Sequence, residues 1–376
     1  MPNTGFDAVA SKIQHDSTFV GMLRTRSAET NIDPGLRERL DSVTEYLDRV
    51  TDVDRPFLSV LLRTQGRRLE SFKDALLCLT SQTDQDFEII VLEHDVTPAD
   101  SQSVRKILER LPPEFLSRLQ LIEVVGGGRA KPLNLGLAAS TGRYVAVYDD
   151  DDVLFANWVE SFKATSATAG GRLMRAVTAN QKVSPEPWSD GRAGFRSISW
   201  PRPEYPERFD LLQHLLVNHS PFMSWAFPRA LFFSYGLRFD EDLAVVEDWD
   251  LILRGSLLCG VEDVPALTAI YRRWEGGSSS YTQHSGMDWK TAEQRVINRI
   301  NSSPLIMPRG AMESMRQMVL YNTALDGYRF LFAGTSLRRP FNSMWNLARP
   351  GFNFAVRLRN RLRRIRQRTG EGQGSS

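Results

Sequence analysis

From residue 56 to residue 148 the chain alternates short apolar runs with longer amphipathic segments. Short runs rich in Val, Ile and Leu are typical of strands buried on both faces, and they predict strands at residues 57–62, 87–92, 119–125 and 144–148. The amphipathic segments between these runs predict helices at residues 69–79, 103–111 and 132–139. Strands that alternate with helices form a parallel sheet covered by helices. We therefore predict an α/β fold with a mostly parallel sheet flanked by helices.

The pattern is less regular on either side of this region. A cap and a proline at Asp33 and Pro34, followed by apolar residues on one face, predict a helix in an N-terminal extension. Residues 180–206 are rich in Pro, Trp, Ser and Arg and predict a long loop or a pair of irregular strands. Beyond them the pattern predicts helices at residues 209–217 and 247–258 and strands at residues 221–227 and 268–274. We expect three parts, namely a helical extension (1–55), a central α/β domain (56–280) and a C-terminal helical region (281–376).

Candidate chemistry gathers where the predicted strands end. Ligands of open α/β sheets bind at the carboxyl ends of the parallel strands, so we expect a common rim formed by Arg63, Glu93, Gly126–Arg129 and Asp149. The last of these strands runs into four consecutive acids, Asp149–Asp152. Four like charges persist in water or beside a hard divalent cation such as Mg²⁺ or Mn²⁺, which prefers oxygen ligands. Asp149 and Asp151 point the same way on an extended segment and can share one metal; a solvated acidic turn is the alternative.

Composition indicates an ordinary globular protein of 376 residues with 41% apolar residues. The two cysteines, Cys78 and Cys259, lie in apolar helical segments, which favours buried reduced thiols over a disulfide and points to the cytoplasm. The N-terminus lacks a basic region followed by an apolar core. No apolar run reaches the roughly 18 to 20 residues of a membrane span, so we expect neither an export signal nor a spanning helix.

The basic residues are concentrated in the C-terminal tail. Residues 327–376 hold 11 arginines and one acid, although the net charge of the chain is +2. Phe354, Leu358, Leu362 and Ile365 fall on one helical face, which predicts a basic amphipathic helix suited to an anionic membrane surface. A helix that docks its apolar face on the main domain is the alternative. Nucleic acid is not an expected partner, because no aromatic stacking motif accompanies the arginines.

Taken in order, several motifs of the chain resemble the inverting GT-A glycosyltransferases of family 2 over about residues 56–280. The resemblance rests on the blocks Leu58–Thr64, Ser81–Thr83, Asp86–Val91, Asn134–Leu137, Thr141–Tyr144, Asp149–Asp152, Gly236–Asp240 and Glu247–Arg254. Each block alone is weak, whereas the ordered set is specific. The resemblance implies a GT-A, Rossmann-like domain that binds a nucleotide-sugar donor.

The acids of this family imply roles for the matching acids here. Asp149 and Asp151 fall on its Asp-any-Asp motif, which implies that they bind Mn²⁺ or Mg²⁺ bridging the donor diphosphate. Asp248 matches the second residue of its Glu-Asp pair, which implies the catalytic base that deprotonates the acceptor hydroxyl. Glu247 would orient the acceptor or support Asp248. The alternative for Glu247 and Asp248 is a simple helix cap.

For the nucleotide, the resemblance implies contacts from Thr64, Glu93, Arg129, Asn134, Asp149 and Asp150. Two departures stand out. Glu93-His94-Asp95 replaces the more usual Asp-Asp-Gly-Ser, which leaves open whether Glu93 or Asp95 meets the base. Trp274 stands where many relatives have a metal-ligating His, so we expect the carboxylates, donor phosphates and water to complete the site rather than His284.

We thus expect a metal-dependent inverting glycosyltransferase that moves one sugar from a nucleotide-diphosphate sugar, with a UDP-sugar as the first candidate. The acceptor is a saccharide or a lipid-linked glycan in cell-surface polysaccharide synthesis, and the expected location is cytoplasmic, with peripheral contact to the inner face of the cell membrane through the tail. The alternatives are a catalytically inactive glycan- or membrane-binding GT-A module and a sugar nucleotidyltransferase, for which Arg63–Arg68 is a poor phosphate loop.

Overall fold

The computed structural model describes residues 18–48, 54–187, 194–276, 284–307, 311–313 and 315–316. The chain divides into a first unit, Met1–Arg309, and a second unit, Gly310–Ser376, and the fold below is that of the first unit. The arginine-rich tail with its predicted amphipathic helix lies outside the described residues. The predicted boundaries near residues 55 and 280 stay predictions. Within the described ranges, no helix combines the length and the apolar character needed to cross a membrane.

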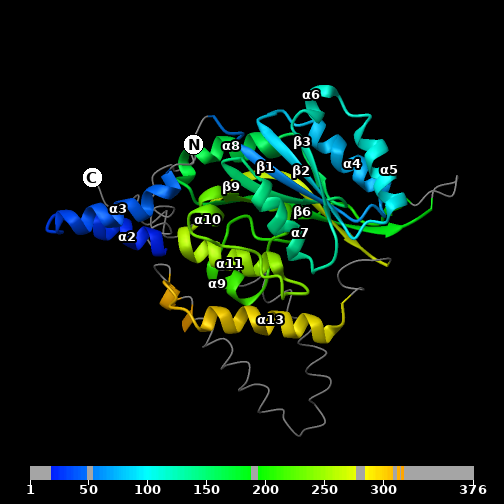
Figure 1. Cartoon of the computed structure of the whole chain (residues 1–376). Coiled ribbons are helices and arrows are strands. Elements are labelled where there is room, and N and C mark those ends of the chain that lie inside the picture. The colour runs from blue at the N-terminus through cyan, green and yellow to red at the C-terminus, as the bar shows by residue number, and fades with distance from the viewer. Residues whose placement is uncertain are drawn as a thin grey trace, which may run out of the picture. The chain divides into compact units, whose positions relative to one another are not determined.

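The sheet begins as the sequence predicts. Four parallel strands lie in the order β3-β2-β1-β4, with bounds β1 (Leu58–Thr64), β2 (Phe87–His94), β3 (Leu119–Val124) and β4 (Tyr144–Asp149). Helices separate them along the chain (Figure 1), which confirms the alternation read from the apolar runs. Every residue of β1 is buried, as expected for a central strand of a sheet covered on both faces.

The second half of the sheet is mixed rather than parallel. It continues from β4 in the order β8-β6-β9-β5, with bounds β5 (Val153–Leu154), β6 (Leu173–Pro185), β8 (Trp225–Pro228) and β9 (Val261–Trp274). Strand β8 is antiparallel to both β4 and β6, whereas β6 and β9 are parallel. Residues 180–206, predicted as a loop or a strand pair, contain the end of β6 and its antiparallel partner β7 (Phe195–Ser197).

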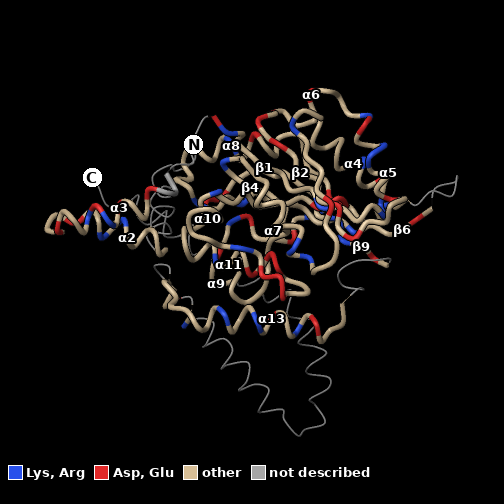
Figure 2. Tube along the Cα trace, viewed as in Figure 1, with Lys and Arg blue, Asp and Glu red and all other residues tan. Residues whose placement is uncertain are grey.

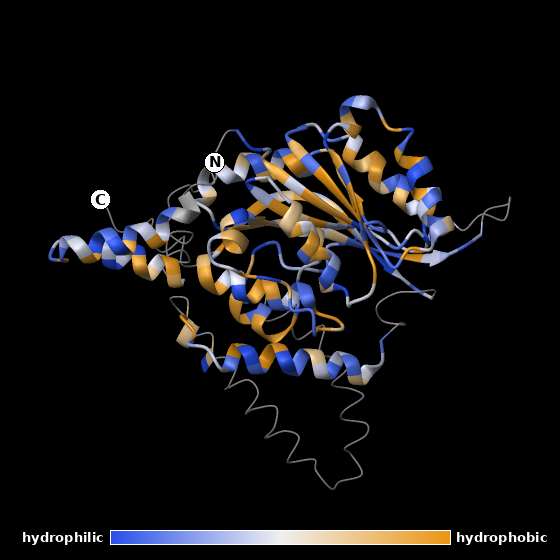
Figure 3. Cartoon of the chain, viewed as in Figure 1, coloured by the Kyte–Doolittle hydropathy of each residue, from blue (hydrophilic) through white to orange (hydrophobic). Residues whose placement is uncertain are grey.

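Helices cover both faces of the sheet. Its strands are largely apolar (Figure 3), as expected for a sheet that is shielded from water on both faces. One core cluster joins the sheet to α4 (Leu69–Thr80), α5 (Pro98–Leu108) and α8 (Trp158–Ala169). The other joins it to α7 (Ala130–Ala139), α10 (Arg229–Phe233) and α11 (Glu247–Cys259). Along β1, Val60 and Leu62 belong to the first cluster and Leu61 to the second, because successive side chains on a strand alternate. The α/β fold with helices on both faces is therefore confirmed.

Smaller elements complete the unit. The predicted N-terminal helix is α3 (Pro34–Asp48), where the Asp33 carboxylate accepts a hydrogen bond from Leu36 N at 2.9 Å, and it packs on α2 (Phe19–Ser27). The others are α6 (Pro113–Leu116), α9 (Leu211–Leu216), η2 (Phe222–Ser224) and α13 (Gly286–Asn301). Cys78 and Cys259 are free thiols; Cys259 is buried as the sequence predicts, whereas Cys78 is only half-buried.

Candidate active site

A cleft of about 730 Å³ opens where β1 and β4 end. The pairing of these parallel strands sets Arg63 opposite Asp149, so both side chains reach the same edge of the sheet. Seven of the lining side chains are Lys or Arg and four are Asp or Glu, and Figure 2 shows basic and acidic positions intermingled in this region. An excess of cationic groups in a recess suits an anionic ligand such as a diphosphate.

The side chain of Arg63 joins two acids that are far apart in the sequence. Its Nε and Nη2 donate to the two carboxylate oxygens of Asp149 at 2.8 and 3.0 Å, and its Nη1 donates to Glu247 at 3.2 Å. Burial alone would raise the pKa of Asp149, but the Arg63 charge and hydrogen bonds outweigh it and hold that pKa below its usual value. Arg63 thus keeps Asp149 ionised and ties the acid run to the start of α11.

The other three acids of the run have different environments. Asp150 accepts a hydrogen bond from Thr64 Oγ1 at 2.5 Å, and burial together with the charge of Asp151 raises its pKa to about 7. Asp151 forms an ion pair with Arg68. Asp152 is buried, accepts from the backbone N–H of Arg272 at 2.8 Å, and has a pKa well above the ordinary value because of burial and the Asp151 charge. The run is therefore not a solvated acidic turn.

These contacts decide which acids fit a divalent cation. Both oxygens of Asp149 already bond Arg63, which leaves it a poor direct ligand. Asp151 lines the cleft with 21% of its side chain exposed, and burial raises its pKa although Arg68 opposes the rise. Among the described residues no group of three His, Cys, Asp or Glu side chains is arranged to hold a metal. One carboxylate plus substrate phosphates and water is nonetheless an ordinary Mg²⁺ site, so Asp151 fits this role.

Glu247 and Asp248 are the first two residues of helix α11, and their pKa values are shifted in opposite directions. Glu247 is buried, and although burial favours its neutral form, Arg129 at 2.8 Å and Arg63 hold its pKa below the usual value. Asp248 is half-buried, and burial together with the Glu247 charge raises its pKa to about 6. The dipole of α11 favours the charged form of an acid in its first turn, but at Asp248 burial and the adjacent acid outweigh it. A carboxylate of this kind titrates near neutral pH, as a general base requires.

Asp248 itself does not line the cleft. Its Oδ2 accepts from Asn218 Nδ2 at 2.9 Å, and its Oδ1 accepts from the N–H of Trp249 at 2.7 Å. The charge of Arg129, which does line the cleft, acts on Asp248. Asp248 thus feels the charge of Arg129 but lies outside the lining of the cleft, and its role as the catalytic base remains a prediction.

The predicted nucleotide contacts separate into two groups. Thr64 and Arg129 line the cleft together with Asp149 and Asp150. Glu93 does not: it is buried, its Oε2 accepts from Ser101 at 2.9 Å, and its Oε1 has no hydrogen-bond partner. The next residue, His94, lines the cleft instead.

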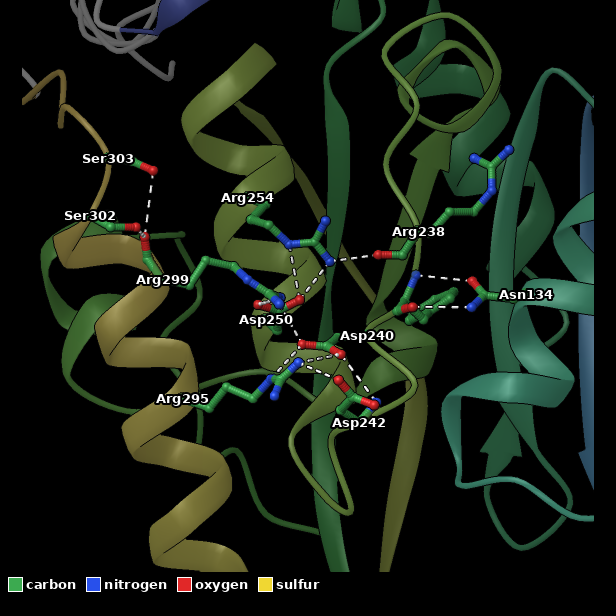
Figure 4. A network of polar contacts seen from close by, with 11 residues as sticks. Asn134, Arg238, Asp240, Asp242, Asp250, Arg254, Arg295, Arg299, Ser302 and Ser303 are labelled. Carbon is green, nitrogen blue, oxygen red and sulfur yellow. Dashed lines mark hydrogen bonds and ion pairs between the residues drawn. The ribbon is translucent and has the colours of Figure 1, made fainter.

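Asn134 has a clear structural task. Its amide bonds both backbone groups of Phe239 at 3.0 Å, and its Nδ2 also donates to Glu241 at 2.8 Å. These bonds fasten the loop before α11 to α7 (Figure 4), and Asn134 does not line the cleft. Contact of Asn134 with the donor stays a prediction.

Helix α13 braces α11 from outside the cleft. Arg299 donates to Asp250 at 2.6 Å and also pairs with Asp240, while Arg254 donates to the other Asp250 oxygen at 2.9 Å (Figure 4). The side chain of Asp250 is fully buried, so these two arginines supply its counter-charge. Apolar residues of α13 and α11 pack together beside the network. Just before Glu247, Val246 has a left-handed backbone with φ of 59°.

Sequence reasoning gave no role to several residues that line the cleft. Trp274, noted only as a departure from the family, carries the guanidinium of Arg68 over its ring at 4.4 Å. Lys182 and Arg273 come from β6 and β9, whose pairing the sequence did not reveal. The signal that could have found Arg68 is the cluster Arg67-Arg68 directly after an apolar strand.

The comparison with protein families agrees with the motifs. Residues 59–231 match the family model for glycosyl transferase family 2. No curated protein matches the chain. The crystal structure of S. aureus TarS 1-349 in complex with UDP-GlcNAc is 17% identical, with a TM-score of 0.49, over 64% of this chain and 65% of that chain. The complex of TarS 1-349 with UDP is 18% identical, with a TM-score of 0.45, over 64% of each chain.

The chain spans less than two thirds of the length of each of these TarS chains. The match to the family model begins in β1 and ends in α10, and it includes the whole acid run. Residues 59–231, just under half of the chain, thus match glycosyl transferase family 2, the GT-A glycosyltransferases that the sequence motifs resemble.

Proposed function

We propose that the protein transfers one sugar, with inversion, from a nucleotide-diphosphate sugar to a saccharide or lipid-linked glycan acceptor. One observation carries the proposal: Arg63 connects Asp149, at the end of β4, to Glu247, beside the half-buried Asp248 whose pKa is about 6. One guanidinium therefore joins the acid run at the end of β4 to the start of α11, where Asp248 follows Glu247. A solely structural ion pair would not require a neighbouring acid with a raised pKa.

Asp248 would accept the proton of the acceptor hydroxyl as that oxygen attacks the anomeric carbon. The bond between this carbon and the diphosphate oxygen breaks on the opposite face, and the nucleoside diphosphate leaves with the electron pair. The cationic lining of the cleft, including Arg129, would stabilise the charge on the leaving diphosphate. A Mn²⁺ or Mg²⁺ ion held by Asp151 would add Lewis-acid stabilisation of the same group.

The finer assignments are proposals that rest on the motifs. They comprise a UDP-sugar as donor, a role in cell-surface polysaccharide synthesis, and a cytoplasmic location with the tail at an anionic membrane. The rival functions are an inactive binding module and a sugar nucleotidyltransferase. The raised pKa of Asp248 favours a catalyst over a binding module, because binding alone does not need a titrating acid.

The test is a panel of nucleotide sugars that includes UDP-GlcNAc, the compound bound to S. aureus TarS, with released nucleoside diphosphate measured in the presence of Mn²⁺. We expect release with at least one donor. The Asp248→Asn variant should bind UDP as the wild type does and lose release by at least about 100-fold, the usual scale of general-base catalysis. An absence of release with every donor, or full activity in the variant, would refute the proposal. Pyrophosphate release from a nucleoside triphosphate and a sugar phosphate would support the nucleotidyltransferase.

A further inference from the structure

The carboxylate that best fits a cation already has a cationic partner. Asp151 pairs with the guanidinium of Arg68, and the two side chains are 21% and 24% exposed. The Arg68 charge also acts on Asp149 and Asp150. One guanidinium therefore occupies the electrostatic position that a divalent cation would take beside Asp151.

Aromatic rings hold this guanidinium in place. Arg68 lies 4.4 Å from the centre of the Trp274 ring, at the end of β9. Trp274 packs edge-on against Phe195 of β7 at 5.5 Å, and Arg272 covers the Phe195 ring at 4.4 Å. The cation and the aromatic ring attract each other beyond simple packing. The side chains of Arg68, Trp274, Phe195 and Arg272 therefore stack in this order, and Arg68 and Trp274 line the cleft.

A diphosphate would compete for Arg68. Guanidinium binds phosphate in a planar, bidentate manner, whereas a carboxylate released by the guanidinium is a preferred ligand of Mg²⁺ or Mn²⁺. Arg68 is partly exposed at the cleft, so its long side chain can reach a ligand there without unfolding its surroundings. Two cations held beside the same carboxylate repel each other, so Arg68 and a divalent cation compete for Asp151.

Building on the proposed function, we infer that Arg68 is a positioning residue that exchanges partners: it holds Asp151 in the free protein and moves to the diphosphate when the donor binds, which opens Asp151 to the divalent cation. Nucleotide and metal then bind with positive coupling, and the coupling depends on Arg68. By linkage, the nucleotide raises the metal affinity by the same factor as the metal raises the nucleotide affinity.

The experiment measures Mn²⁺ binding to the full chain by the EPR signal of free Mn²⁺, with and without UDP. In the wild type we expect weak Mn²⁺ binding alone and binding about tenfold tighter with UDP, a usual size of coupling between two ligands. In Arg68→Gln, Mn²⁺ alone should bind about tenfold tighter than to the wild type, and UDP should tighten it further by a smaller factor than in the wild type. Asp151→Asn placed on Arg68→Gln should abolish the gain.

Arg67→Gln is the matched control. It removes the same charge from the adjacent cleft-lining residue, which has no contact with Asp151. If both variants raise the Mn²⁺ affinity equally, the effect is general electrostatics and the inference is wrong; it is also wrong if Arg68→Gln leaves the affinity unchanged. Should Arg68→Gln fail to fold, Trp274→Leu keeps the charge but loses the stack, and it should bind Mn²⁺ alone more tightly than the wild type. Because no sugar transfer is measured, these results are independent of the donor panel.

Discussion

Arg63 is the residue on which the geometry of the cleft depends. It stands at the end of a fully buried strand, with 9% of its side chain exposed, and compensates the charges of Asp149 and Glu247. Burial would lower its pKa, but these two acids raise it above its ordinary value, so the guanidinium stays charged. Buried charges are tolerated only as partners, and the removal of one leaves the others unpaired.

Replacing Arg63 with Met should therefore destabilise the protein. Breaking a buried ion pair costs about 3 to 5 kcal/mol, and we expect about 3 kcal/mol because the Asp149 side chain remains 28% exposed. Urea denaturation followed by fluorescence measures the free energy of unfolding. Arg67→Met, at an exposed position, should change it by less than about 0.5 kcal/mol. Equal effects of the two substitutions would contradict the role of Arg63.

The pH dependence of activity should report Asp248. A general base works when deprotonated, so kcat/KM should rise with pH up to the pKa of about 6 and level off above it. The hydrogen bond from Asn218 stabilises the charged form and lowers this pKa. Asn218→Ala should therefore move the acid limb to higher pH.

Gln213→Ala, in which the lost amide contacts Asp210 instead of Asp248, should leave the pH limb in place. A limb that does not move in Asn218→Ala would indicate that another group, such as Asp150, is being titrated.

At the scale of elements, the sequence predicted the helices and strands that depend on a local pattern of apolar and polar residues. The apolar runs located β1 to β4, and the Glu-Asp pair located the start of α11. The structure adds elements that the apolar pattern did not predict, because α8 lies within residues 153–172 and β6 begins at residue 173. Likewise Glu93, expected just after the second strand and on the rim of the site, is the second-last residue of β2 and bonds Ser101 instead of lining the cleft.

The brace between α13 and α11 should be testable by hydrogen exchange. Arg299→Met removes one of the two cationic partners of the buried Asp250, and we expect faster exchange in residues 240–250 and 286–301 and a loss of about 1 to 3 kcal/mol. Arg295→Met removes a more exposed arginine that contacts Asp240 and Asp242 only, and it should have a smaller effect. Unchanged exchange in Arg299→Met would show that apolar packing alone holds the helix.

The close approach of β1 to the turn before β4 depends on Gly142. A Cβ atom there would lie 2.6 Å from Ser59 N, where the backbone cannot yield easily. Gly142→Ala should destabilise the protein by about 1 to 3 kcal/mol, as overpacking usually does. Gly286→Ala, with open space at the start of α13, should be neutral or slightly stabilising. Thermal unfolding of the two variants makes the comparison, and equal melting temperatures would contradict it.

At the scale of the molecule, the site unites segments that are distant in sequence. Hydrogen bonds of Arg63 join residues 86 and 184 positions away, and Trp274 comes from another part of the sheet. No local pattern predicts these pairings: Arg63 and Arg129 were expected near the site, but their bonds to Asp149 and Glu247 were not. Charge is also distributed unevenly along the chain. Residues 327–376 are strongly basic although the whole chain has a net charge of only +2.

The tail leads to a prediction for the full chain at membranes. Arg357, Arg359, Arg361 and Arg363 changed together to Gln should weaken the affinity for vesicles of anionic lipid, measured by sedimentation, by about 1,000-fold, since four residues at about 1 kcal/mol each contribute about 4 kcal/mol. Four exposed basic residues of the first unit serve as a control when changed to Gln: Arg105, Lys106, Arg110 and Lys290. Equal losses in both variants would mean that the tail has no special affinity for the membrane.

The left-handed backbone of Val246 affects which substitutions at this position evolution would favour. A β-branched residue in this conformation is strained by about 1 to 3 kcal/mol, and Gly or Asn would relieve that strain. Selection for heat resistance alone would favour Gly or Asn at this position. A rigid valine directly before Glu247 and Asp248 is therefore expected where the orientation of these acids matters more than thermal stability. Variants with Gly or Asn at this position should melt at a higher temperature and turn over more slowly.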